Sequence, residues 1–232
     1  MPIQSPRADR GHSALPERLT RIDDCDRRAH HFLTCRDRCL FFGDFHASAG
    51  WAGGSINQLI ANFKRPRPQI EREPIGERLR RYREQAIATI SAALRRQFTR
   101  EEIESRCTFV PIPTSKRTDD PEYCDRLERT LRRAFDGYAA DIRLLLRQRT
   151  STCSDHCSGG DRRSYERLLE ITQLDPGCLV TPLRPVVVLF DDVLTSGKHY
   201  KVARTRIREA FPEQPIVAVF VARRAQTSAA RW

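Results

Sequence analysis

Two neighbouring carboxylates, Asp191 and Asp192, directly follow a run of apolar residues at 186–190. The run is rich in β-branched residues and predicts a buried strand. A short polar turn comes next, with two hydroxyl side chains and a glycine: Thr195, Ser196 and Gly197. A helical pattern follows, so the backbone N–H groups of the turn and the helix dipole together attract an anion. The segment therefore predicts an anion-binding turn beside two acids.

The two acids restrict which anion this turn can bind. A phosphate is repelled by adjacent carboxylates unless they face away from it, whereas the cis hydroxyls of a ribose need acceptors of this kind. The hydroxyl side chains and Lys198 add donors and positive charge at the turn. We interpret the segment as a site for a ribose phosphate; the alternative is a generic strand–turn–helix unit with acids at the strand end.

The same segment resembles the signature with which type I phosphoribosyltransferases bind phosphoribosyl pyrophosphate (PRPP), an apolar run followed by Asp/Glu-Asp-x-x-Thr-Thr/Ser-Gly-x-Thr. The resemblance implies that Asp191 and Asp192 hold the ribose hydroxyls and take part in catalysis. It implies a 5′-phosphate cradle of six residues: Leu194, Thr195, Ser196, Gly197, Lys198 and His199. His199 departs from the pattern, because the family usually places Thr there.

A second segment, residues 109–117, resembles the Val-Pro-x-Pro loop after the first core strand of competence protein F (ComF)-like phosphoribosyltransferases. The resemblance implies a pyrophosphate loop made of Pro113, Thr114, Ser115, Lys116 and Arg117. In that loop the two basic residues would neutralise the leaving group, and Lys116 would join the acids as a catalytic residue.

The resemblance extends more weakly along the chain. Residues 57–64 are similar to the Leu-Ile-x-x-x-Lys helix of ComF-like proteins, and residues 147–150 to the Arg-x-Arg-x-Thr that starts their mobile loop. It implies four mobile-loop residues that contact substrate: Arg147, Arg149, Thr150 and Arg163. The zinc ribbon of many ComF proteins and their Arg-Gly-Phe-Asn-Gln stretch are absent in recognisable form, which indicates a divergent branch.

The elements that must position these residues follow an α/β pattern. Strands are predicted at 39–46, 107–111, 186–190 and 216–222, with helices between them, and apolar runs on consecutive strands favour a parallel sheet. The resemblance specifies a Rossmann-like type I phosphoribosyltransferase fold with a central parallel sheet and a small N-terminal hood. We expect a flexible or poorly ordered extension at 1–38, the hood and N-terminal helices at 39–100, and the core at 101–232.

Charge and cysteine usage leave two further questions open. The net charge of +11 and a pI near 9.7 favour polyanionic partners, including nucleic acid through a basic surface, although solvated helix faces explain the charge equally well. The pairs Cys35/Cys39 and Cys153/Cys157, with histidines nearby, have spacings that zinc can use; reduced structural thiols are the default.

These observations lead to three hypotheses for function. The first is a Mg²⁺-dependent enzyme that transfers a phosphoribosyl group from PRPP to a nitrogenous acceptor. The second is a non-enzymatic sensor of PRPP or a nucleotide, and the third a nucleic-acid-associated effector of a competence or anti-phage (retron-type) system. No apolar stretch is long enough to span a membrane and no export signal is recognisable, so we expect a cytoplasmic protein. A homodimer is compatible with the sequence.

Overall fold

A six-stranded sheet runs through the computed structural model, which describes residues 15–72, 74–152 and 164–225. Its strand order is β1-β2-β8-β7-β3-β4, in which β1 is antiparallel to β2 and every other neighbouring pair is parallel. The strands are β1 Thr20–Arg21, β2 Arg38–Phe45, β8 Ile216–Arg224, β7 Val186–Leu194, β3 Cys107–Pro111 and β4 Asp141–Ile142. The described chain is therefore an α/β protein with a mixed, mostly parallel sheet, and the expected parallel core is confirmed at this level.

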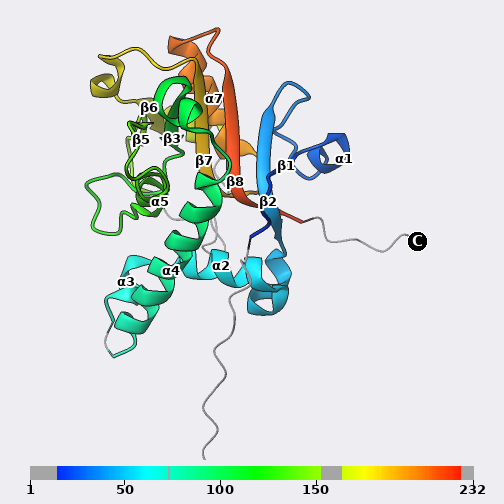
Figure 1. Cartoon of the computed structure of the whole chain (residues 1–232), viewed down its shortest axis with the longest axis vertical. Helices are drawn as coiled ribbons and strands as arrows, with labels where there is room; N and C mark the ends of the chain where they lie inside the picture. Colours follow the sequence, from blue (N-terminus) through cyan, green and yellow to red (C-terminus); the bar gives the residue numbers. More distant parts are fainter. Residues whose placement is uncertain (1–14, 73, 153–163, 226–232) are drawn as a thin grey trace, which may run out of the picture.

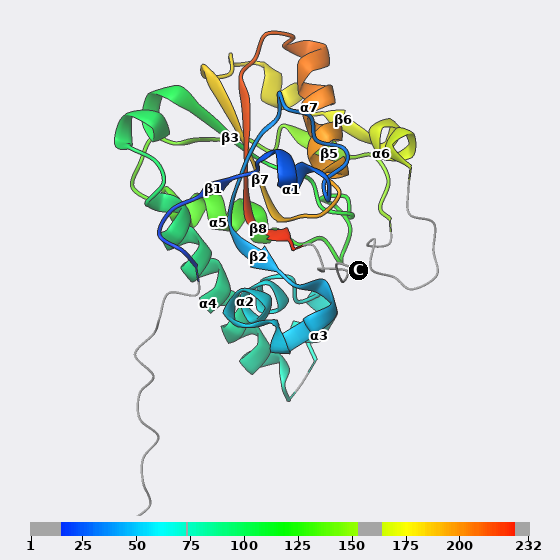
Figure 2. The same ribbon diagram turned by 90° about the vertical axis from the view of Figure 1, so that its right-hand side faces the viewer.

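Helices cover both faces of this sheet (Figures 1 and 2). On one face, residues of neighbouring strands, such as Phe109 of β3 and Val188 of β7, pack against α2, α4 and α5. On the other face, Val110 and Val187 pack against α7, and α6 in turn packs on α7. This alternation is the period of two that a strand buried on both faces imposes. The helices are α2 Ser55–Phe63, α4 Gly76–Arg95, α5 Arg126–Ala134, α7 Lys198–Ala210 and α6 Tyr165–Ile171.

Smaller elements connect these layers. Beyond the main sheet, β5 and β6 form an antiparallel pair. The remaining elements are α1 Asp24–Arg27, α3 Arg67–Ile70, β5 Leu146–Gln148, β6 Thr172–Leu174, the 3₁₀ turns Ala47–Gly53 and Pro176–Leu179, and the π turn Glu102–Arg106. No helix in the described ranges is long and apolar enough to cross a membrane.

Three features differ from the sequence-based expectations. β2 was expected in a hood, but it pairs with β8 inside the central sheet. Residues 15–38 were expected to form an extension, yet within this stretch Leu15, Ile22 and Leu33 are buried. The third difference concerns the strand predicted at 186–190, which continues to Leu194 and therefore contains both acids.

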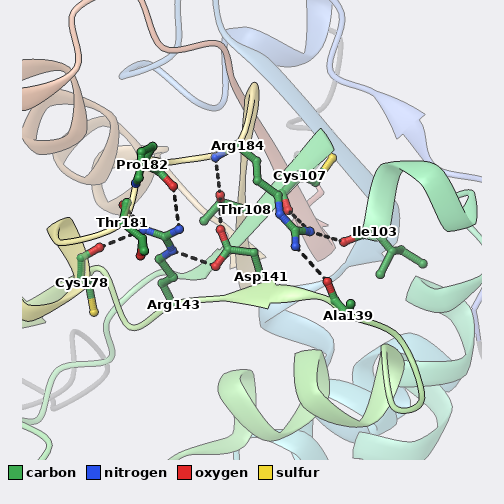
Figure 3. A network of polar contacts seen from close by, with 10 residues as sticks. All are labelled: Ile103, Cys107, Thr108, Ala139, Asp141, Arg143, Cys178, Thr181, Pro182 and Arg184. Carbon is green, nitrogen blue, oxygen red and sulfur yellow. Dashed lines mark hydrogen bonds and ion pairs between the residues drawn. The ribbon is translucent and has the colours of Figure 1, made fainter. Parts of the chain in front are cut away.

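A polar network joins the amino ends of β3 and β4 to the chain that leads into β7 (Figure 3). Arg184 donates to the carbonyls of Ile103 at 2.6 Å and Ala139 at 2.9 Å, and its own N–H donates to the Thr108 hydroxyl. That hydroxyl donates to Asp141, which is paired with Arg143. The carbonyls that accept from the Arg143 guanidinium belong to Cys178, Thr181 and Pro182. These contacts fix the end of the sheet opposite to the acids.

The aromatic cluster under β3 supports a stability prediction. Phe109 is fully buried, and its ring lies 4.3 Å from that of Phe135 and 5.1 Å from that of Phe98, between centroids. We expect Phe109→Ala to lower the free energy of unfolding by about 3–5 kcal/mol, because the truncation leaves a cavity that the cluster cannot fill. Urea denaturation followed by circular dichroism measures this change.

The control is Tyr82→Ala on α4, where the ring is 40% exposed. That substitution is expected to change the free energy of unfolding by only about 0.5 kcal/mol. Equal effects of the two substitutions would contradict the packing described for Phe109.

Candidate functional site

A pocket of about 550 Å³ lies at the carboxyl ends of β3 and β7. Parallel sheets commonly bind ligands at this edge, where loops from several strands meet. Four stretches of chain supply most of the lining residues: 64–68 after α2, 113–116 after β3, alternate residues of 122–126 leading into α5, and 191–200 from β7 into α7, apart from Ser196. Phe220 of β8 completes the lining. Segments far apart in the sequence thus share one cavity.

Positive charge prevails in this pocket. Three carboxylates line it, namely Glu122, Asp191 and Asp192. Twice as many cationic side chains do so: Lys64, Arg65, Arg67, Lys116, Arg126 and Lys198. An excess of fixed cations in a partly desolvated cavity favours anionic ligands with more than one charge.

Asp192 anchors the cationic side of the pocket. Its side chain is only 6% exposed, and its two oxygens contact the Lys64 ammonium at 3.1 Å and the Arg126 guanidinium at 2.5 Å. Burial alone would raise the pKa of this carboxyl, but the two cations outweigh burial and hold it well below the usual range. Asp192 is therefore ionised, and its partners come from the end of α2 and the start of α5.

Asp191 has the opposite protonation behaviour. It is half-buried and accepts a hydrogen bond from the Asp192 N–H at 2.7 Å. Burial, together with the charge of Asp192, raises the pKa of Asp191 to about 6, although His199 opposes the shift. No cation of the described ranges forms an ion pair with Asp191. One acid of the pair is thus held as an anion and the other exchanges a proton near neutral pH.

The turn after β7 has the conformation that the sequence predicts for an anion socket. Gly197 has φ +86°, and α7 begins at the next residue. Among the hydrogen bonds within the described chain, none uses the backbone N–H of Ser196 or Gly197. The first N–H groups of a helix have no intrahelical acceptor, so these donors point to a ligand site beside Lys198.

An N-terminal segment supports the back of this turn. The imidazole of His30 contacts the Thr195 carbonyl, and the Phe32 N–H donates to the Ser196 carbonyl at 3.1 Å. Leu33 packs so closely on Gly197 that an added Cβ would lie 2.9 Å from its side chain. Contacts with the carbonyls of Thr195 and Ser196 hold the turn in place, and Thr195 and Gly197 line the pocket.

The predicted pyrophosphate loop lies on the opposite wall. Pro113, Thr114, Ser115 and Lys116 line the pocket, with the Lys116 ammonium 2.6 Å from Glu122. The Thr114 hydroxyl is buried and has no hydrogen-bond partner among the described residues. The fifth loop residue does not line the pocket, because the Arg117 guanidinium turns to Asp119 at 2.5 Å.

Three of the four mobile-loop residues predicted by resemblance do not line the pocket. Arg147 lies in β5 and pairs with Asp175 at 3.3 Å, in the antiparallel hairpin. Arg149 and Thr150 are exposed and do not line the cavity. Arg163 lies outside the described residues.

Sequence reasoning missed the two cations that hold Asp192. Lys64 closes the helix that resembles the ComF-like Leu-Ile-x-x-x-Lys pattern, so that pattern was a usable signal for it. Arg126 carries no local signal, since its partner is 66 residues away in sequence. Only the three-dimensional arrangement identifies it.

The cysteine pairs give no metal centre among the residues that the structure describes, where no group of three or more His, Cys, Asp or Glu side chains could hold a metal. Cys39 is buried in β2, whereas Cys35 is exposed. Cys153 and Cys157 lie outside the described residues.

The chain was also compared with known proteins. It matched no protein-family model, no curated protein and no solved structure. Inference about function therefore rests on the geometry and charge of the pocket.

The unequal acids give a testable titration. We expect an NMR titration of the carboxyl carbons to show Asp191 with a midpoint of about 6, because burial and its anionic neighbour favour the protonated form. Asp192 should stay ionised well below pH 3.8, the ordinary value. The variant Asp191→Asn should lack the resonance that titrates near pH 6, and a midpoint near 3.8 for Asp191 in the wild type would contradict the assignment.

The turn gives a second prediction. Gly197→Ala should lower the free energy of unfolding by about 1–3 kcal/mol through backbone strain, and more where Leu33 cannot move away. Gly137→Ala is the matched control, because Gly137 has φ +79° but nothing within 4 Å of an added Cβ. Thermal unfolding of both variants tests this, and a larger loss for Gly137→Ala would show that Leu33 does not restrict the turn.

Proposed function

We propose that this protein binds PRPP or a related ribose phosphate in the pocket and acts as a divergent phosphoribosyltransferase of the ComF-like type. One observation carries the proposal: a glycine turn at a helix start, two unequal acids and a cationic loop converge on one cavity. The order of strand, acids and turn in the sequence resembles the PRPP signature except at His199, and the spatial arrangement is compatible with that interpretation.

The ligand groups find complementary partners in the pocket. The 5′-phosphate fits the turn at Gly197, where the backbone N–H, the helix dipole and Lys198 add positive potential. The ribose hydroxyls fit Asp191, which has no ion-pair partner in the described ranges. The pyrophosphate fits the opposite wall, near Lys116 and Ser115.

Magnesium suits this arrangement as a companion of the ligand. The described chain offers no ready-made metal cage, and Asp192 is engaged by two cations. Mg²⁺ usually keeps one or two carboxylates and takes its other ligands from phosphates and water, so Asp191 is the residue that would hold it. When bound, the metal would supply charge neutralisation between pyrophosphate and ribose.

The residues of the chain would contribute by position and charge. Breaking the bond between C1′ and pyrophosphate sends the electron pair to the pyrophosphate and leaves positive charge on the ribose. Lys116 and Arg65 would stabilise the departing anion, and the carboxylates at the end of β7 would stabilise the cationic sugar. No side chain has to form a covalent bond with the substrate.

A second candidate function is a non-enzymatic sensor of the same ligand. It is favoured by the double pairing of Asp192, which leaves one acid instead of two for the ribose. His199 in place of the usual Thr favours it as well. A sensor binds PRPP without releasing pyrophosphate, so turnover separates the two functions.

Calorimetry with PRPP and Mg²⁺ tests binding. We expect binding to the wild type and a loss of at least about tenfold in affinity, or about 1.4 kcal/mol, for Lys116→Met and for Asp191→Asn. Arg208→Met is the control, because Arg208 is exposed in the last turn of α7 and does not line the pocket. No heat of binding at millimolar PRPP, or equal losses in all three variants, would refute the proposal. Pyrophosphate release with a panel of nucleobases then separates enzyme from sensor.

A further inference from the structure

Cys124 lines the pocket at the start of α5, and the proposed function gives it no role. The Arg83 guanidinium donates to its sulfur at 2.9 Å. Arg126 interacts with the same thiol: burial lowers the pKa of Arg126, but the interactions with Asp192 and Cys124 outweigh burial and raise it. The thiol thus lies beside two guanidinium groups in the wall of the pocket.

Both arginines are strongly buried. Arg83 is 4% exposed, and the Nε atoms of Arg83 and Arg126 have no hydrogen-bond partner in the described chain. The nearby carboxylates are Asp125, 3.5 Å from Arg83, and Asp192, 2.5 Å from Arg126. The Nη2 atom of Arg83 contacts both the sulfur of Cys124 and the carboxylate of Asp125. Reactive cysteines lie in electropositive, partly exposed surroundings, and neighbouring arginines are one source of that positive potential.

The other described cysteines have different surroundings. Burial raises the pKa of Cys39, Cys107 and Cys178, which makes them poor nucleophiles. Cys25 and Cys35 are exposed. Among the described cysteines, Cys124 alone combines partial exposure, a place in the pocket wall and a hydrogen bond from a buried arginine.

We propose that Cys124 is an oxidation-sensitive thiol of the pocket, with a hydroperoxide as its co-reactant. The thiolate sulfur attacks one peroxide oxygen, so an S–O bond forms and the O–O bond breaks. The other oxygen leaves with the electron pair and takes up a proton, giving water or an alcohol, while the sulfur becomes a sulfenic acid. Sulfur loses the two electrons that the peroxide gains. The guanidinium groups of Arg83 and Arg126 stabilise the departing oxyanion.

Oxidation also changes the anion site. The added oxygen enters the wall of the pocket and accepts hydrogen bonds from Arg126, in competition with Asp192. Oxidised protein should therefore bind anions more weakly. This consequence rests on the proposed function, whereas the reactivity of the thiol does not.

The test treats the full chain with one equivalent of hydrogen peroxide, traps sulfenic acid with dimedone and quantifies each cysteine by peptide mass spectrometry. We expect Cys124 to be labelled about fivefold or more faster than Cys25 and Cys35, although those two are more exposed. Labelling of Cys124 no faster than that of Cys35 would overturn the proposal, whatever any variant does.

Variants on α4 locate the cause. Arg83→Met should slow the labelling of Cys124 several-fold, and Arg83→Lys should retain more of it, because the positive charge remains. Arg78→Met is the matched control, since Arg78 is exposed on the same helix. An Arg83→Met variant that keeps the wild-type circular dichroism spectrum and labels as fast as wild type would also overturn the proposal. If that variant does not fold, Arg83→Lys and Arg78→Met are each compared with wild type. Slower labelling of Cys124 in Arg83→Lys alone supports the guanidinium contact, and labelling of both variants at the wild-type rate opposes it.

Inorganic pyrophosphate separates this proposal from the proposed function. Bound pyrophosphate should protect Cys124 from dimedone labelling, and peroxide-treated protein should retain less pyrophosphate in equilibrium dialysis. Selective labelling without protection would leave Cys124 as an oxidation site and count against the pocket as an anion site. If pyrophosphate protects Cys124 but Cys124 is labelled no faster than Cys35, the pocket is supported as an anion site and the proposal of a reactive thiol is refuted.

Discussion

A buried carboxylate that must stay charged organises this molecule. Asp192 is almost fully enclosed at the end of β7, and an unpaired anion there would cost several kcal/mol. Lys64 and Arg126 offset that cost by pairing with the carboxylate. The two pairs hold the end of α2 and the start of α5 at the same edge of the sheet. The pocket forms between the segments that this pairing brings together.

The two ends of the sheet use arginine in different ways. At the amino ends, Arg184 donates to backbone carbonyls, and Arg143 donates to backbone carbonyls and pairs with Asp141, so both guanidinium groups interact within the chain. At the carboxyl ends, cations outnumber acids and several polar atoms have no partner in the described residues. The polar contacts at the amino ends of the strands therefore stabilise the fold, whereas the positive potential at the carboxyl ends can attract an anionic ligand.

Local sequence patterns predicted much of this arrangement but missed the contacts between residues that are far apart in the sequence. The apolar runs at 107–111 and 186–190, and the turn at Gly197, are signals within a few residues, so strands, turn and helix start were predictable. The pairing of Arg126 with Asp192 joins separate elements and has no local pattern. Residues 15–38 were misjudged because a few apolar side chains, among them Leu33, are scattered in a polar stretch, and tertiary packing decides their burial.

The position of β8 has a consequence for how the chain assembles. It lies between β2 and β7 in the sheet, although in sequence it follows every other strand described. During synthesis on the ribosome, β2 emerges before β8, so the edge of β2 that pairs with β8 stays unpaired until residues 216–224 have been synthesised. Such late closure favours slow folding and gives chaperones time to act on the exposed strand.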